Sequence, residues 1–170
     1  METFNTEQVI KTIAKMCDII IENEVPFCEL DSAAGDGDFG MSLAKGFKVV
    51  KEEFANHSRD DIGAFLKDCG MIITEHCGGA SGPIWGSGFR AMGKYAAGKS
   101  TINLVELAEM VQSSIDAVQK RGGAKLGDKT LLDALIPATE SLKASGAANE
   151  TFAVALAKSA DAAVAGGEAT

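Results

Sequence analysis

The stretch that decides the fold class is residues 5–20, which read Asn-Thr-Glu-Gln-Val-Ile-Lys-Thr-Ile-Ala-Lys-Met-Cys-Asp-Ile-Ile. Asn5 with Gln8 three residues later is typical of a capping box, the arrangement that starts a helix. The sequence therefore predicts a helix that begins at Asn5 and is stopped by Pro26. Its apolar residues recur at spacings of three and four, the period of a helix with one buried face: Val9, Ile10, Ile13, Met16, Cys17 and Ile20.

The same helical period continues along the rest of the chain. No stretch alternates with a period of two, so we expect no strands. Pro137 is expected to kink the helix that contains it. These patterns predict about seven helices in one antiparallel all-α domain that covers residues 1–170. The further helices are expected at residues 43–54, 61–77, 81–98, 103–122, 129–144 and 149–165, with caps from Ser58 or Asp61, Asn103, Asp128 and Asn149.

Composition and charge exclude several classes of protein. The 170 residues are 46% apolar and 24% charged, as in an ordinary globular domain, and the formal net charge is −8. Such an acidic balance argues against nucleic acid or an anionic membrane as the main partner. No signal peptide or membrane span is evident, so we expect a cytoplasmic protein. The four cysteines form no Cys-x-x-Cys pair, which argues against a zinc or redox site.

An acidic, glycine-rich stretch separates the first two predicted helices. Residues 30–40 read Leu-Asp-Ser-Ala-Ala-Gly-Asp-Gly-Asp-Phe-Gly and contain Asp31, Asp36 and Asp38. Carboxylates this close repel one another, while the glycines let the backbone bend so that they converge. A divalent cation that prefers oxygen ligands, such as Mg²⁺, relieves that repulsion. The alternative is a solvated turn in which aspartate and glycine act as turn formers.

Two other loops each open a predicted helix. Residues 78–83 read Gly-Gly-Ala-Ser-Gly-Pro, and free N–H groups with a serine hydroxyl there favour an anion, although Gly-Gly is also an ordinary helix stop. Residues 121–130 read Arg-Gly-Gly-Ala-Lys-Leu-Gly-Asp-Lys-Thr. They are no Walker A loop, because Asp128 interrupts the motif and a helix precedes it. They still suit one wall of a nucleotide-binding site, with Leu131 available to pack against an adenine.

Three familiar arrangements do not fit the chain. Residues 35–40 match G-x-G-x-x-G, but no strand precedes them. A calcium loop begun at Asp31 would place Ser42 where a glutamate is needed. No Ser-His-Asp or Cys-His arrangement can be argued, so we assign no nucleophile or base. Phosphoryl transfer suits the three loops, because it needs mainly positioning and charge neutralisation.

Together the motifs resemble those of the ADP-binding L subunits of bacterial dihydroxyacetone kinases, a DAK2-domain family. The matching patterns are Asp31-x₄-Asp36-Gly-Asp38-x-Gly40, Gly-Gly-Ala-Ser-Gly-Pro at 78–83, and Arg121-Gly-x₄-Gly-Asp-Lys-Thr130 followed by Leu-Leu-Asp. They occur in the family's order over the whole chain. The resemblance implies an up-and-down antiparallel barrel of about eight helices, with a nucleotide and two Mg²⁺ ions at one end.

The resemblance also implies roles for individual residues. Three carboxylates would hold the metal ions that bridge the phosphates: Asp31, Asp36 and Asp38. Two helix starts would bind ADP or ATP through its phosphates: Gly40, Met41 and Ser42 in the first, and Gly79, Ala80 and Ser81 in the second. A third group would line the nucleoside: Gly122, Thr130 and Leu131.

The partners that the resemblance implies are other subunits. A phosphotransferase-system carrier, the M subunit, would convert held ADP to ATP from a phosphorylated histidine. The γ-phosphoryl would then pass to dihydroxyacetone bound to a separate K subunit. A transcriptional regulator is a further implied partner. No K-type domain lies in these 170 residues, so we do not expect the chain to phosphorylate the sugar alone.

Three alternatives stay open at this point. The same fold could serve a nucleotide-sensing regulatory module without turnover, or a metal-stabilised helical scaffold. The sugar could be another short ketose or aldose. The phosphoryl donor could be the carrier or ATP.

Two departures from the family's pattern carry expectations. Phe39 stands where many relatives have histidine, which removes a polar contact from that position. Relatives also continue beyond the Gly-Gly-Glu-Ala-Thr stretch into a last helix and a segment with Arg and Asp-Pro-Gly. We therefore expect weakened ADP retention by residues 1–170. Nanomolar ADP binding in calorimetry would contradict that expectation.

Overall fold

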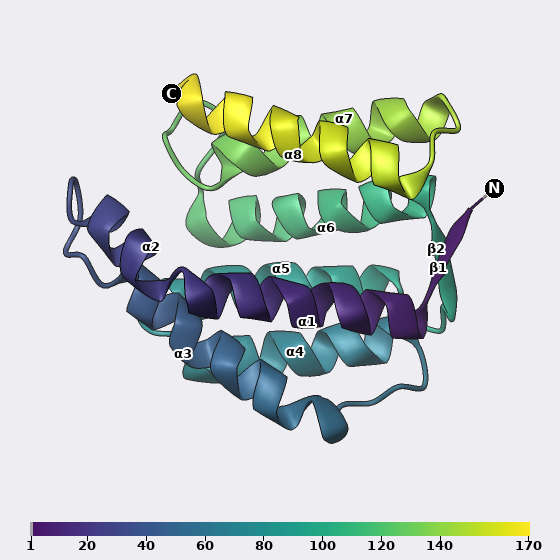
Figure 1. Cartoon of the computed structure of the whole chain (residues 1–170), viewed down its shortest axis with the longest axis horizontal. Coiled ribbons are helices and arrows are strands. Elements are labelled where there is room, and N and C mark those ends of the chain that lie inside the picture. Colours follow the sequence, from purple (N-terminus) through teal and green to yellow (C-terminus); the bar gives the residue numbers. More distant parts are fainter. Residues whose placement is uncertain (1) are drawn as a thin grey trace.

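The computed structural model describes residues 2–170, and its regular elements are all helices apart from one pair of short strands (Figure 1). This confirms the predicted all-α class. No helix in this range is both long and apolar enough to cross a lipid bilayer. The elements are β1 (Thr3–Asn5), α1 (Thr6–Glu22), α2 (Glu24–Asp31), α3 (Phe39–Glu52), the 3₁₀ turn η1 (Glu53–Ala55), α4 (Ile62–His76), α5 (Ser81–Tyr95), β2 (Thr101–Asn103), α6 (Leu104–Gly122), α7 (Leu132–Ala147) and α8 (Phe152–Glu168).

Local capping starts three of the helices where the sequence predicts. The Asn5 side chain accepts the Gln8 N–H at 2.9 Å, and the Gln8 side chain accepts the Asn5 N–H at 3.0 Å. A second reciprocal box opens α6, with Asn103 as its cap. Asp61 caps α4 by accepting the Ala64 N–H at 2.8 Å. At the other end of α6, Gly123 has a φ of 75° and ends the helix as expected.

The prediction that Pro26 stops the first helix is wrong. Helix α1 already ends at Glu22, and Pro26 lies in the first turn of α2. Proline is tolerated there because a first-turn N–H has no partner within the helix. The break at Asn23 therefore produces a separate short helix. The residues described contain eight α-helices, where the sequence predicted about seven.

Two predicted caps are also wrong. Helix α7 begins at Leu132, because the Asp128 side chain accepts the Lys125 N–H inside the preceding loop instead. Helix α8 is capped by Thr151, while Asn149 lies before it in a left-handed conformation with a φ of 53°. At the start of α8 the Thr151 side chain takes the capping role, whereas no side chain caps α7.

The two strands were not expected from the sequence. They pair antiparallel, with Thr3 opposite Asn103, Phe4 opposite Ile102 and Asn5 opposite Thr101. Three residues are too few to show a period of two. The pairing joins the start of α1 to the start of α6.

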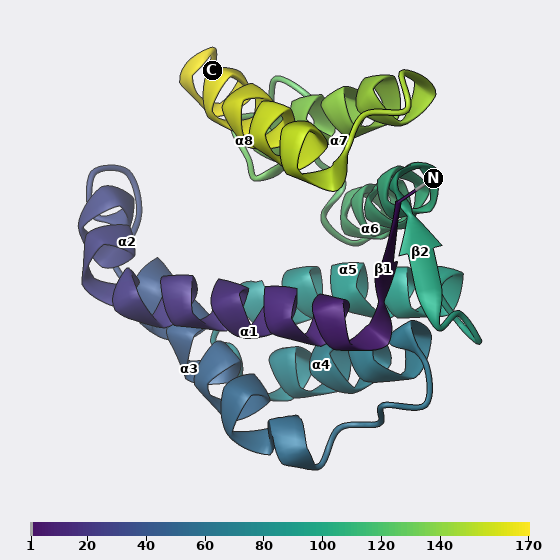
Figure 2. The ribbon, with the colours of Figure 1, turned by 45° about the vertical axis from the view of Figure 1, so that its right-hand side comes forward.

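The helices pack as an up-and-down series (Figures 1 and 2). From α3 to α8 each helix packs on the next, and α1 packs on α3. At the end where the strands pair, the Phe4 and Phe152 rings stack with centroids 4.0 Å apart, and the Phe152 N–H donates to Glu2 at 2.8 Å. These contacts hold the N-terminal strand against the start of α8. Apolar cavities of about 710 and 230 Å³ lie between the helices.

Helices α4 and α5 approach each other backbone to backbone. A Cβ on Gly63 would lie 2.5 Å from the Gly93 carbonyl oxygen and 2.6 Å from Ala97 backbone atoms. Real side chains do not approach so closely, so only glycine fits at this crossing. The α4–α5 pair forms the wall from which α5 presents its first turn to the site described below.

We expect Gly63→Ala to lower the free energy of unfolding. The resulting overpacking costs about 1–3 kcal/mol, which exceeds the gain of about 1 kcal/mol in helix propensity. The control is Gly167→Ala in α8, where a Cβ would meet nothing within 4 Å. That control should stabilise the protein or leave it unchanged. Urea unfolding of both variants tests this, and equal stabilisation by both would contradict the close packing of α4 and α5.

Candidate functional site

The three loops singled out from the sequence lie at the same end of the bundle, opposite the strand pair (Figure 1). They are the α2–α3 loop, the α4–α5 joint and the α6–α7 loop. The first two touch, since the Gly78 N–H donates to the Ser42 carbonyl at 3.1 Å. The third lies beside the start of α5, where a Cβ on Gly122 would be 4.0 Å from Ile84 Cδ1. The chain therefore gathers all three loops into one region.

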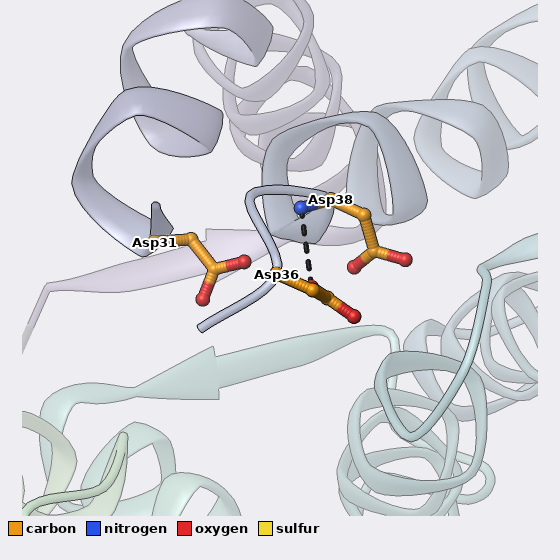
Figure 3. Close-up of side chains that lie close together, drawn as sticks. All are labelled: Asp31, Asp36 and Asp38. Atoms are coloured by element: carbon orange, nitrogen blue, oxygen red, sulfur yellow. Dashed lines mark hydrogen bonds between the residues drawn. The ribbon is translucent and has the colours of Figure 1, made fainter. Parts of the chain in front are cut away.

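Three carboxylates converge in the α2–α3 loop (Figure 3). Asp31, Asp36 and Asp38 each offer one oxygen, and these oxygens all lie within 4.8 Å of one another. Asp31 is the last residue of α2 and is half-buried, while the other two are exposed. None of the three takes part in a salt bridge within residues 2–170.

Backbone hydrogen bonds give the loop its shape. One oxygen of Asp31 accepts the N–H groups of Gly37 at 2.9 Å and Phe39 at 3.3 Å, so Asp31 ties the end of α2 to the start of α3. Gly37 has a φ of 78°, which side-chain-bearing residues rarely adopt. A Cβ on Gly40 would lie 1.9 Å from the Glu24 carbonyl oxygen. These two glycines therefore let the carboxylates converge, as the sequence pattern predicts.

The donor set of this loop fits a hard divalent cation. All three groups offer carboxylate oxygens, the ligands that Mg²⁺ prefers, and no lysine or arginine neutralises them. Mg²⁺ usually keeps several positions for water or phosphate rather than filling its coordination sphere with protein ligands. Three carboxylates on an exposed loop thus leave room for a phosphate-bearing ligand.

The first turn of α3 offers less to an anion than expected. Of the three residues assigned there, Met41 donates its N–H to Cys28 Sγ at 3.3 Å and Ser42 donates its N–H to the Asp38 carbonyl at 2.8 Å. The N–H of Gly40 donates to no other backbone group in the range described. Phe39 packs near Phe27 with ring centroids 6.2 Å apart and lines the larger cavity.

The start of α5 presents free backbone donors. Gly79 has a φ of 52°, and its N–H and that of Ala80 donate to no backbone acceptor in residues 2–170. Ser81 is the first residue of α5, and its own N–H donates to the Gly78 carbonyl at 3.2 Å. Unpaired donors at a helix start attract phosphate, helped by the helix dipole. Of the first turns of α3 and α5, the first turn of α5 is the better anion site.

The α6–α7 loop lies beside the α5 turn. Gly122 is the last residue of α6, and Thr130 and Leu131 directly precede α7. Leu131 packs with Ile84 in a small apolar cluster around Ile115, Val118 and Leu132. The loop therefore places the Leu131 side chain against an apolar cluster that Ile84, in the first turn of α5, also packs against.

One residue that organises this loop was given no role from the sequence. Asp133 is only 2% exposed, and its oxygens accept the N–H groups of Gly127 at 2.5 Å and Thr130 at 2.8 Å. The Thr130 and Gly127 donors hold the pKa of this carboxyl below its usual range. The spacing Thr-x-x-Asp before an apolar run is half of a capping box, and that signal could have found it.

We expect Mg²⁺ to stabilise the protein through the acidic loop. A cation present at 100 times its dissociation constant adds about 2.7 kcal/mol to the unfolding free energy. Asp36→Asn with Asp38→Asn should abolish that gain, and should raise the melting temperature in EDTA because the repulsion is relieved. Thermal unfolding with and without Mg²⁺ tests this. Asp161→Asn in α8 is the control and should keep the full Mg²⁺ effect; a Mg²⁺ effect that survives the double change would contradict the site.

Comparisons with known proteins show what this chain is similar to. The model of the family described as "DAK2 domain" matches residues 33–170. The PEP-dependent dihydroxyacetone kinase 2 ADP-binding subunit DhaL of Listeria innocua is 42% identical over 127 residues, covering 73% of this chain and 59% of that protein. The corresponding Escherichia coli subunit is 34% identical over 149 residues, covering 88% and 71%.

A solved structure agrees as well. The dihydroxyacetone kinase of C. freundii in its native form superposes with a TM-score of 0.76 at 26% identity, over 93% of this chain and 28% of that one. This chain thus spans 59% of the Listeria protein and a smaller part of the C. freundii kinase. By its match to the family model and its identity to these relatives, the chain belongs to the DAK2 domain family.

Proposed function

We propose that the chain is the nucleotide-holding subunit of a dihydroxyacetone kinase. It would bind ADP or ATP with Mg²⁺ and pass the γ-phosphoryl group to dihydroxyacetone held on a separate K subunit. A phosphotransferase-system carrier, the M subunit, would recharge the ADP. The observation that carries the proposal is the gathering of three carboxylates, free backbone donors and an apolar wall at one end of the bundle.

Each loop has its own part in holding the nucleotide. Asp31, Asp36 and Asp38 would hold Mg²⁺, which when bound neutralises phosphate charge. The N–H groups of Gly79 and Ala80, together with the Ser81 hydroxyl, would bind phosphate oxygens. Two Mg²⁺ ions are part of this proposal, since three carboxylates can serve two cations that share ligands.

The chain's contribution to the reaction is positioning rather than proton transfer. In the reaction, a hydroxyl oxygen of the sugar bonds to the γ-phosphorus, the bond from that phosphorus to the β-phosphate oxygen breaks, and ADP is left behind. The hydroxyl proton would go to a base on the subunit that holds the sugar, because the loops described here present no histidine. Phosphoryl transfer depends mainly on such alignment and charge stabilisation.

The names of the relatives support the substrate and the partners. Both relatives above are named ADP-binding subunits of PEP-dependent dihydroxyacetone kinases. A subunit with that name works with other proteins.

Transfer of labelled phosphoryl tests the proposal. Purified chain would be mixed with K and M subunits from a DAK2-family system, labelled phosphoenolpyruvate with the general phosphotransferase proteins, and dihydroxyacetone. We expect labelled dihydroxyacetone phosphate only when all components are present. Asp36→Ala with Asp38→Ala should lower the transfer at least about 100-fold, because the charges that hold Mg²⁺ are lost.

The controls separate this function from the alternatives. Circular dichroism of the double variant should show unchanged helicity, and Asp161→Asn should transfer normally. A chain that binds Mg²⁺ and ADP but never transfers phosphoryl would support a nucleotide-sensing module instead. A chain that binds neither would leave only a structural role for the acidic loop.

A further inference from the structure

Asp133 is a buried carboxylate without a cationic partner. It is 2% exposed, and no salt bridge within the described part of the chain includes it. Burying a charge is costly unless hydrogen bonds replace the lost water. The N–H groups of Gly127 and Thr130 supply those bonds, one to each oxygen. The carboxylate is therefore held in place by the α6–α7 loop, and the loop is held by it.

The loop needs such a restraint because its backbone is strained. Lys129 has a φ of 57° and Gly127 a φ of 93°. A left-handed residue other than glycine is unfavourable and persists only where its surroundings hold it. The two N–H groups that Asp133 accepts lie on either side of Lys129. Asp133 thus restrains the strained segment from both sides.

The same bonds determine which part of a nucleotide this loop can contact. The N–H groups of Gly127 and Thr130 are occupied, so they cannot also donate to phosphate. An ionised carboxylate beneath the loop repels phosphate as well. At the start of α5 the N–H groups of Gly79 and Ala80 are free within the described residues, and the adjacent Gly78 N–H donates to the Ser42 carbonyl in the first turn of α3. Leu131, at the end of this loop, packs against an apolar cluster, which suits the uncharged part of the ligand.

We propose that Asp133 is a positioning residue that sets the affinity for the nucleoside part of ADP by fixing Thr130 and Leu131. The inference rests on the proposed function, because it takes ADP as the ligand. It assigns Asp133 no contact with the nucleotide. Its effect on binding is confined to the adenosine half and does not extend to the phosphates.

Two probes separate these halves: ADP and inorganic pyrophosphate, each with Mg²⁺. Calorimetry would measure both dissociation constants for the 170-residue chain and for Asp133→Asn. The amide has the same size, but it replaces one acceptor oxygen with a donor, so one loop N–H loses its partner. We expect ADP affinity to fall at least about tenfold. Pyrophosphate affinity should stay within about twofold, whereas a purely structural role would weaken both ligands.

Asp128→Asn is the matched control in the same loop. Asp128 is exposed and accepts only the Lys125 N–H, at 2.9 Å, so its loss should leave the ratio of the two affinities unchanged. Gly127→Ala is a second test that does not alter the buried carboxylate. A Cβ there meets nothing within 4 Å but requires a φ of 93° that alanine disfavours. It should reproduce the selective loss of ADP affinity, which keeps the proposal testable if Asp133→Asn does not fold.

The outcomes distinguish this inference from the proposed function. In a chain that binds ADP more tightly than pyrophosphate, an equal loss of affinity for both ligands would overturn the role of Asp133 alone. Unchanged affinity for both ligands would overturn that role as well. Failure of the unaltered chain to bind ADP would overturn the proposed function, and this inference with it. A selective loss of ADP affinity supports both.

Discussion

The electrostatic repulsion among Asp31, Asp36 and Asp38 is the constraint on which the architecture of the site end depends. Three carboxylates within 4.8 Å are unfavourable without a cation, so the chain must hold them together by other means. It does so by ending α2 at Asp31, whose carboxylate accepts two N–H groups from the loop, and by placing Gly40 against the Glu24 carbonyl.

The three loops divide the binding of a nucleotide among different chemical groups. The α2–α3 loop supplies negative oxygens, and the first turn of α5 supplies backbone donors. The α6–α7 loop supplies Thr130 and Leu131, while its Gly127 and Thr130 N–H groups donate to Asp133. A single loop could not present all of these, because carboxylates and phosphate repel each other at close range. Separate loops place attractive and repulsive groups at different positions along the ligand.

Features formed by residues close in sequence could be predicted, and those formed by distant residues could not. The capping boxes at Asn5 and Asn103 and the cluster of aspartates depend on neighbours within eight residues. The β1–β2 pair joins segments far apart along the chain, and nothing within either segment signals the other. The cap assigned to Asp128 failed because its side chain accepts the Lys125 N–H, while Asp133 accepts the Thr130 N–H that a cap at Asp128 would take.

The strand pair also bears on the order in which the molecule folds. Successive helices from α3 to α8 contact their sequence neighbours, so most of the bundle has low contact order and can assemble helix by helix. The pairing of Thr3 with Asn103 and the stack of Phe4 on Phe152 instead close very long loops, which is entropically slow. The N-terminal strand would accordingly dock late, after the bundle has assembled, at the end remote from the three loops.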